Sequence, residues 1–168
     1  MADVPDHHGC SLGKWYASVS RGRFGWYPAF AVIEAPGAAH GDHIRAGSRG
    51  PVHTMSLGKV LVAVLPPSAA LGTIRNWHLE ALTEHTITDA HRFLDELEVA
   101  RRRGYALDIE EGETGLCCIA APIATPVDRP RAAIAIAVET ERLHHEPQRL
   151  VSHVVVAARR AGALLGQA

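Results

Sequence analysis

The sequence has few cysteines and almost no excess charge of either sign, and each shortage excludes a class of protein. Its 168 residues include three cysteines, an odd number with one adjacent pair, so we expect no disulfide framework of the kind found in small secreted domains. The net charge of −1 and the pI near 6.8 lack the basic excess that is typical of an autonomous DNA-binding domain. Nucleic acid is therefore not an expected direct partner.

Long apolar runs are also missing. The longest candidate, Ala132 to Val138, is far shorter than the roughly 18 residues that a membrane span needs. The N-terminus shows no basic segment followed by an apolar one, so we expect no signal peptide and no membrane partner. The expected location is the cytoplasm, where thiols stay reduced.

The sequence does contain enough apolar material for one domain. A hydrophobic content of 47% over 168 residues suffices for one well-buried core. Residues 1–13 are expected to be poorly ordered. The Gly-rich part after them predicts two strands, Trp15 to Val19 and Pro28 to Glu34, with a turn at 21–23 between them.

Helical spacing begins in the middle of the chain. Thr54 is expected to cap a short, very apolar helix that Pro66 and Pro67 end, and 68–77 predicts another brief helix. The clearest helix has Thr88 as its N-cap and Gly104 as its terminator, with arginines in the last turn that complement the helix dipole.

The remaining elements complete an α+β pattern. Alternation and turn residues predict a hairpin of Tyr105 to Ile109 with Leu116 to Ile123, then a third strand, Arg131 to Glu139. In that third strand large and small apolar residues alternate, so the two faces differ: Ile134, Ile136 and Val138 against Ala133, Ala135 and Ala137. Pro147 opens a last helix that ends at Gly166. The order predicts an antiparallel sheet with helices packed on it.

The hairpin carries the polar groups that suggest a site. Because side chains alternate along a strand, Asp108 and Cys118 are expected to face the same side. Leu107, Ile109 and Ile119 are expected to fill the opposite face.

Two stretches of the chain carry a family resemblance. The first is His53-Thr54-Met55-Ser56-Leu57-Gly58-Lys59-Val60-Leu61-Val62-Ala63. The second combines Arg102-Arg103-Gly104-Tyr105-Ala106-Leu107-Asp108-Ile109-Glu110-Glu111 with Gly115-Leu116-Cys117-Cys118-Ile119-Ala120-Ala121-Pro122-Ile123. Thr86-Ile87-Thr88 and the small-residue strand 132–138 support it. Over about residues 28 to 166 the chain resembles the effector-binding domain of IclR-type bacterial transcriptional regulators.

The resemblance implies a GAF-like α+β domain over residues 14–168 that binds a small organic acid, needs no cofactor and forms a homodimer or homotetramer. In such regulators a separate N-terminal winged helix-turn-helix contacts DNA, and nothing before Thr54 has room for one. Any effect on DNA is therefore expected to be indirect.

The resemblance also maps an effector site onto seven residues: Ser56, Leu57, Asp108, Leu116, Cys118, Ala135 and Ala137. Part of this site follows from physics, because backbone N–H groups at a helix start, here 55–57, attract a carboxylate. Protonated Asp108 and Cys118 are able to bond a keto or hydroxyl oxygen. Family members that bind small keto acids often have hydroxyl side chains in place of Ala135 and Ala137, so a more apolar or aromatic acid is expected.

Plainer interpretations stay open for the same residues. Asp108 also fits a carboxylate satisfied locally at a strand end, and Cys118 fits a small buried hydrophobe. Ser56 also fits an ordinary first-turn residue.

Two other functions remain open as well. A thiol enzyme would use Cys118 or Cys117, with His53 or Lys59 lowering the pKa of the thiol, although Asp108 would raise it. A truncated remnant would only associate with full-length relatives.

Several weaker motifs are set aside. Gly50 to Lys59 lacks the spacing of a phosphate-binding loop. No metal site is expected, since the loop histidines and cysteine show no ligand-pair spacing: His7, His8, Cys10, His40 and His43, with Asp42. The helix dipole explains Arg101 to Arg103, and His144 and His145 are expected to face solvent.

Overall fold

The computed structural model describes residues 13–22, 25–33, 50–75, 77–124 and 132–165. Five strands and six helical segments follow one another along these residues. In chain order they are β1 (Gly13–Gly22), β2 (Gly25–Ile33), the 3-10 helix η1 (Val52–Thr54), α1 (Ser56–Ala63), α2 (Pro67–Ile74), α3 (Ala90–Arg103), β3 (Ala106–Ile109), β4 (Leu116–Ile123), β5 (Ala132–Glu139), α4 (Thr140–His145) and α5 (Pro147–Leu165).

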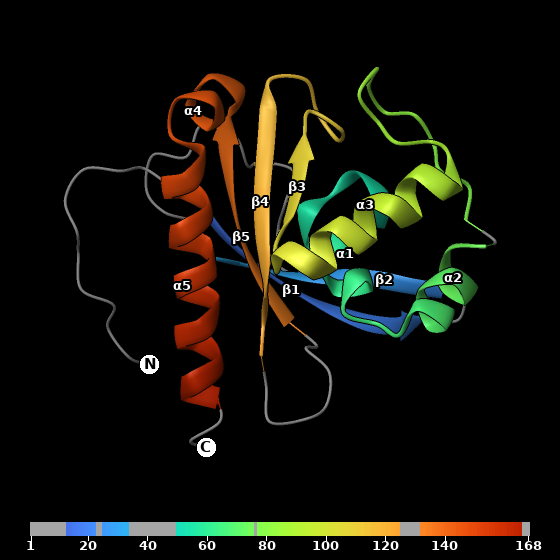
Figure 1. Cartoon of the computed structure of the whole chain (residues 1–168), viewed down its shortest axis with the longest axis horizontal. Helices are drawn as coiled ribbons and strands as arrows, with labels where there is room; N and C mark the ends of the chain where they lie inside the picture. The colour runs from blue at the N-terminus through green and yellow to red at the C-terminus, as the bar shows by residue number, and fades with distance from the viewer. Residues whose placement is uncertain (1–12, 23–24, 34–49, 76, 125–131, 166–168) are drawn as a thin grey trace.

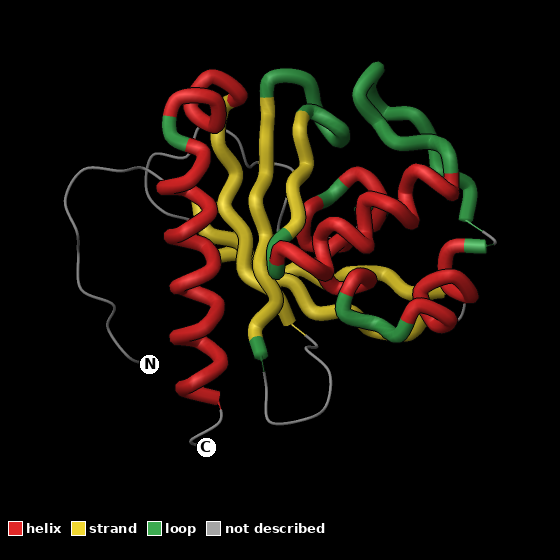
Figure 2. Tube along the Cα trace, viewed as in Figure 1, coloured by secondary structure: helices red, strands yellow, loops and turns green. Residues whose placement is uncertain are grey.

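The strands form one antiparallel sheet in the order β2-β1-β5-β4-β3. The long helix α5 packs on β4 and β5, and α1 packs against β3, β4 and β5 and against α3. Figure 1 shows α5 on one side of the strands and α1, α2 and α3 on the other, and Figure 2 shows the same layers by secondary structure. The predicted α+β fold, an antiparallel sheet with helices packed on it, is confirmed.

The face under α5 is apolar and filled with large side chains. Ile134, Ile136 and Val138 of β5 point to this face, as the alternation in the sequence predicted. They pack with Leu150 and Val154 of α5. This layer is a core that holds α5 to the sheet by removing apolar surface from water.

The opposite face is built from small side chains. Ala120 of β4 and Ala133 and Ala135 of β5 belong to a second core cluster, together with Phe93 and Leu97 of α3. Because alanines leave room above the sheet, α1 lies so deep between sheet and α3 that all eight of its residues are buried.

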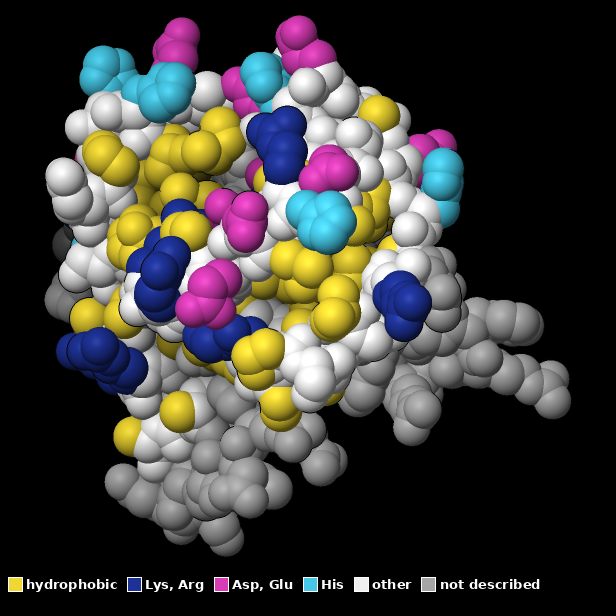
Figure 3. Space-filling model, turned by 45° about the vertical axis from the view of Figure 1, so that its right-hand side comes forward, with side chains coloured by type: hydrophobic (Ala, Val, Ile, Leu, Met, Phe, Trp, Pro, Cys, Tyr) yellow, Lys and Arg dark blue, Asp and Glu magenta, His cyan; other side chains and the backbone are white. Residues whose placement is uncertain are grey.

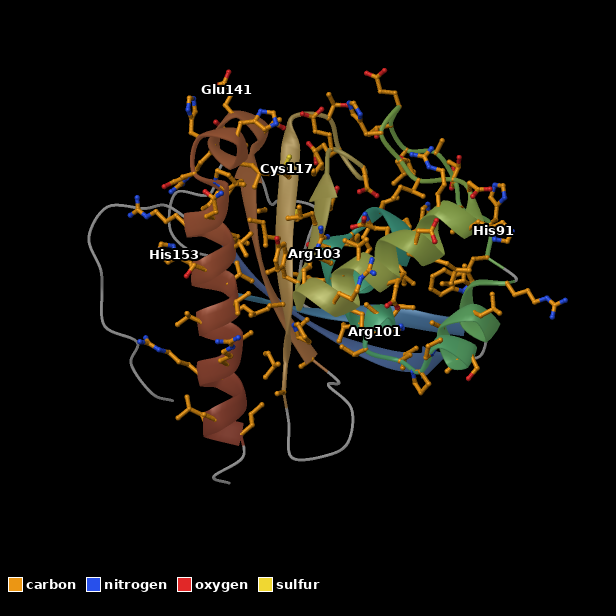
Figure 4. The ribbon with its side chains drawn as sticks, in the orientation of Figure 1. His91, Arg101, Arg103, Cys117, Glu141 and His153 are labelled. Carbon is orange, nitrogen blue, oxygen red and sulfur yellow. The ribbon has the colours of Figure 1, made fainter. Side chains whose placement is uncertain are left out.

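Two contacts fix the position of α1. A Cβ atom on Gly58 would lie 2.4 Å from the carbonyl oxygen of Val52, so only glycine lets η1 approach the helix this closely. At the other end Arg101 of α3 donates hydrogen bonds to the carbonyl oxygens of Ala63 (2.8 Å) and Leu65 (3.1 Å), which satisfies groups that a helix end leaves open (Figure 4). Arg101 therefore does more than complement the dipole of its own helix.

The helix starts differ from the predictions by one or two residues. Asp89, not Thr88, is the N-cap of α3, since its carboxylate accepts a hydrogen bond from the backbone N–H of Arg92 at 2.9 Å. Thr54 does not cap α1, because it ends η1 and donates instead to the carbonyl oxygen of Pro51. Gly104 ends α3 in the left-handed conformation, as predicted, with φ of 78°.

Two further differences concern the hairpin and the segment after β5. Leu107 and Ile119 fill the α5 face as predicted, but Ile109 is 43% exposed. It ends the outermost strand, while α5 covers β4 and β5. The short helix α4 was not predicted, and His144 and His145 within it are exposed, as expected.

Other predictions concern residues outside the described ones. These are the poor order predicted for residues 1–13, apart from Gly13, which begins β1, the turn residue Arg23, the end of the last helix at Gly166 and the loop residues considered for metal, His7, His8, Cys10, His40, Asp42 and His43. None of the helices among the described residues combines the length and apolarity that crossing a membrane requires. On the face in Figure 3, basic side chains lie between acidic and apolar ones rather than in one patch.

Candidate functional site

The sheet register brings three of the proposed site residues into one row. Asp108 of β3 pairs with Cys118 of β4, and Cys118 pairs with Ala137 of β5. Because partners across an antiparallel sheet point to the same face, the three side chains lie next to one another on the α1 side. The neighbouring row on that face is Ala106, Ala120 and Ala135.

The N-terminal turn of α1 approaches this face. Met55 is the N-cap and contributes no side-chain hydrogen bond to the helix end. Ser56 is only 1% exposed, and its Oγ finds no hydrogen-bond partner among the described residues. Leu57 packs in the same apolar cluster as Ala135. A buried hydroxyl without a partner is costly, so the first turn of α1 holds unused hydrogen-bonding capacity.

Leu116 lies on the same strand as Cys118, two positions before it. It begins β4, is half-buried and pairs with Glu139. Its carbonyl oxygen accepts a hydrogen bond from the N–H of Glu110, so its backbone closes the hairpin.

Asp108 supplies the carboxyl group of the row, and its buried surroundings shift the pKa of that group. Its Oδ1 accepts a hydrogen bond from the backbone N–H of Glu111 at 2.9 Å, so the plainer interpretation of a locally satisfied carboxylate is partly correct. Burial nevertheless raises the pKa of Asp108 to about 7, against the opposing effect of hydrogen bonds from Glu111 and Gly112 and of the charge on Lys59. At neutral pH the group is therefore divided between a hydrogen-bond acceptor and a donor.

A buried ion pair stands beside Asp108, and sequence reasoning missed it as part of the site. Lys59 of α1 is completely buried, and its Nζ donates to the carbonyl oxygen of Leu107 (3.0 Å) and to Oε1 of Glu111 (2.5 Å). Oε2 of Glu111 has no hydrogen-bond partner within the described part of the chain. Burial raises the pKa of Glu111. The sequence feature that could have revealed this pair is a lysine inside a short, largely apolar helix.

The two thiols lie on opposite faces and are both poor nucleophiles. Cys117 points to the α5 face, where its Sγ lies 3.4 Å from Oγ1 of Thr140, and burial raises the pKa of its thiol. The pKa of Cys118 is raised well above its usual value by burial and then by Asp108, its cross-strand neighbour. Since the thiolate is the reactive form, both cysteines remain protonated near neutral pH.

A polar loop before α3 holds the turn of the hairpin. Oγ1 of Thr83 donates to the carbonyl oxygen of Glu110 at 2.6 Å, and Oγ1 of Thr86 donates to that of Glu111 at 2.7 Å. Glu110 also accepts a hydrogen bond from Oγ1 of Thr140, which contributes most to lowering the pKa of its carboxyl group. These bonds fix the segment that carries Glu111 beside Lys59. Within the described residues, no group of three His, Cys, Asp or Glu side chains is arranged to hold a metal ion.

Comparison with known proteins gives consistent matches. Residues 39–162 match the protein family described as bacterial transcriptional regulator IclR C-terminal. The p-hydroxybenzoate hydroxylase transcriptional activator of Acinetobacter baylyi is 38% identical over 116 residues, which are 69% of this chain and 41% of that protein. The transcriptional regulator BhcR of Paracoccus denitrificans is 35% identical over 134 residues, which are 77% of this chain and 48% of that protein.

A solved structure extends these matches to the fold. It is the inducer-binding domain of the transcription factor PobR from Acinetobacter, a double mutant in complex with 3-hydroxybenzoic acid. It is 31% identical with a TM-score of 0.73, and the match covers 94% of this chain and 89% of that one. The chain spans less than half the length of the two regulators named above.

Proposed function

Because the chain belongs to the IclR family of bacterial transcriptional regulators and matches its C-terminal domain, we propose that it senses a small organic acid at the first turn of α1. The observation that carries the proposal is a buried, unpartnered Ser56 hydroxyl at the start of α1, a helix that packs on the three strands carrying Asp108, Cys118 and Ala137. Ser56, Leu57, Asp108, Leu116, Cys118, Ala135 and Ala137 are the proposed contact residues.

The chemistry of these groups suits a carboxylic acid with an apolar body. Backbone N–H groups and the positive dipole end at the start of α1 favour the carboxylate, and the Ser56 hydroxyl adds a donor. Protonated Asp108 is able to donate a further hydrogen bond. Ala135 and Ala137 offer only methyl groups, so the far part of the ligand is apolar. An aromatic acid fits this division, and the PobR domain with bound 3-hydroxybenzoic acid supports that choice.

The regulatory role is part of the same proposal. The domain, residues 14–168, forms a homodimer or homotetramer in the cytoplasm, and bound acid changes how the subunits are arranged. That change alters DNA binding by a winged helix-turn-helix on a longer chain or on a partner, since the chain spans under half of those two regulators.

Catalysis is not part of the proposed role. The relatives are transcriptional regulators by name, and the raised pKa values of Cys117 and Cys118 argue against a thiol nucleophile. Iodoacetamide at neutral pH is expected to label both cysteines slowly. Fast, selective alkylation of Cys118 would instead favour the thiol enzyme.

A thermal-shift screen followed by calorimetry tests the sensor. The probes are 3-hydroxybenzoate, 4-hydroxybenzoate, benzoate, pyruvate and glyoxylate, and the aromatic acids are expected to raise the melting temperature most. Ala137→Leu, which adds a bulky side chain to the row, is expected to abolish the shift, whereas Val156→Ala, an exposed position on α5, leaves it unchanged. If the folded protein shows no change in melting temperature with any acid, the sensor proposal is wrong. The alternative of a truncated remnant that only associates with full-length relatives is then favoured. Gel filtration with and without the acids then reports the oligomeric state.

A further inference from the structure

Three ionisable side chains from two elements are buried together beside the proposed site. Lys59 comes from α1, and Asp108 and Glu111 come from the β3–β4 hairpin. All three side chains are largely excluded from solvent. The N–H of Glu111 donates to Asp108, and the ammonium of Lys59 contacts Glu111, so the three groups form a chain, Lys59–Glu111–Asp108.

The charges in this chain do not balance when both acids are ionised. Two carboxylates and one ammonium leave a net charge of −1 in a buried place, which is costly, while one bound proton makes the group neutral. The geometry decides which acid takes the proton. Lys59 lies against Glu111 and stabilises its charged form. The hydrogen bonds that Asp108 accepts from backbone N–H groups do not offset the effect of its burial, so the proton is placed on Asp108.

The groups that face Asp108 come from every element around it. Lys59 on α1 is the cation, Glu111 in the hairpin is the anion, and Cys118 on β4 is a thiol. Ala137 on β5 brings no charge. The proton on Asp108 is thus set by a balance between one positive and one negative neighbour.

We infer that Lys59 and Glu111 are positioning residues that assign a proton to Asp108, so that an organic anion binds beside it together with that proton. The inference rests on the proposed sensor function and adds two residues that act through Asp108 rather than on the ligand. With Glu111 held as the ionised partner of Lys59, Asp108 meets an arriving carboxylate as a donor and not as a second negative charge.

Linkage gives the sign of the effect. The pKa of free Asp108 is about 7, and a bound anion raises it further, so binding takes up a proton. Affinity is then constant below pH 6 and falls above pH 7. For 3-hydroxybenzoate, whose carboxylate is ionised throughout, the dissociation constant is expected to rise about tenfold between pH 6 and pH 8.

Calorimetry with 3-hydroxybenzoate at pH 6, 7 and 8, in pairs of buffers with different ionisation enthalpies, tests the inference. Wild type is expected to take up about half a proton at pH 7 and nearly one at pH 8. Asp108→Asn is expected to bind with no pH dependence in this range. Glu111→Gln removes the anion and leaves the Lys59 cation, so the loss of affinity is expected to begin at a lower pH. Glu98→Gln, which removes an ion-paired carboxylate on the surface of α3, is the matched control and keeps the wild-type profile.

The outcomes separate this inference from the sensor proposal. Binding of 3-hydroxybenzoate without proton uptake overturns the role of Lys59 and Glu111 and leaves the sensor intact. A uniform loss of affinity at all pH values in Glu111→Gln shows a merely structural role and also overturns it. If no acid binds, the sensor proposal fails, and carboxyl ¹³C titration of the free protein still decides the charge assignment. A midpoint for Asp108 below pH 5, or one that Glu111→Gln leaves unmoved, contradicts it.

Discussion

The two faces of the sheet differ in what they bury. Under α5 lie branched side chains such as Ile136 and Leu150, which fill the space between sheet and helix. On the α1 side alanines cover the sheet, and polar groups such as Lys59, Asp108 and Ser56 are buried among apolar ones. The first face stabilises the fold mainly by apolar burial. The second carries polar groups whose burial costs free energy, and this cost favours a site on that face.

The strongest test of this contrast removes the buried cation. Lys59→Met leaves the Glu111 carboxylate buried without a charged partner, so at pH 8 the free energy of unfolding is expected to fall by about 3–5 kcal/mol. Urea unfolding measures the loss. The double variant Lys59→Met/Glu111→Leu is expected to recover most of it, since no charge then stays unpaired. A single variant as stable as wild type would mean that the pair contributes nothing.

A truncation on each face sharpens the contrast. Leu150→Ala on the α5 side is expected to lower the free energy of unfolding by about 2–5 kcal/mol while the affinity of the folded protein for 3-hydroxybenzoate stays the same. Leu57→Ala is expected to lower both, because it is buried on the α1 side within the proposed site. Denaturant unfolding and calorimetry measure the two quantities. Equal effects of both variants on affinity would erase the distinction between the faces.

The pH dependence of stability isolates Asp108. Its folded-state pKa of about 7 lies above the value of 3.8 for the unfolded chain, so the native state binds more protons between these values and stability falls as pH rises toward 7. Relative to Asp108→Asn, wild type is expected to lose roughly 2–3 kcal/mol between pH 5 and pH 7 and little beyond pH 8. Urea unfolding across this range gives the difference. Parallel curves for the two proteins would show that Asp108 ionises normally.

The smallest expected change concerns the unpartnered hydroxyl. Ser56→Ala removes a buried oxygen that finds no partner in the described structure, so the free energy of unfolding of the free protein is expected to rise by about 1 kcal/mol. Binding of 3-hydroxybenzoate is expected to weaken about tenfold, as for a lost hydrogen bond to a charged group. Thermal unfolding with and without the acid measures both. A destabilised free protein with unchanged affinity would make Ser56 an ordinary helix residue.

Local patterns predicted much of the fold. The two-residue period placed Asp108 and Cys118 on one face and split β5 into an isoleucine side and an alanine side, and both are present. The start of α3 was misplaced because Thr88 and Asp89 are both good caps and only the bond to Arg92 decides between them. The helix α4 was missed because its few residues are largely polar and too short for a period.

The contacts that local patterns did not predict depend on distant partners. Lys59 and Glu111 are separated by 52 positions, and their contact follows from the depth at which α1 lies on the sheet. The position of β1 between β2 and β5 likewise depends on pairing with a strand near the other end of the chain. Neither residue type nor spacing encodes such contacts directly, so the charged part of the candidate site became visible only in three dimensions.

The bond from Lys59 to Leu107 also bears on self-association. Glu110 pairs with Leu116 through its backbone N–H, and by alternation the carbonyl of Leu107 points away from β4, toward the open edge of the sheet. The lysine ammonium occupies that acceptor, which another strand would otherwise use to add to the edge. The same buried cation that pairs with Glu111 thus removes one acceptor from the open edge of β3, which disfavours the addition of another strand there.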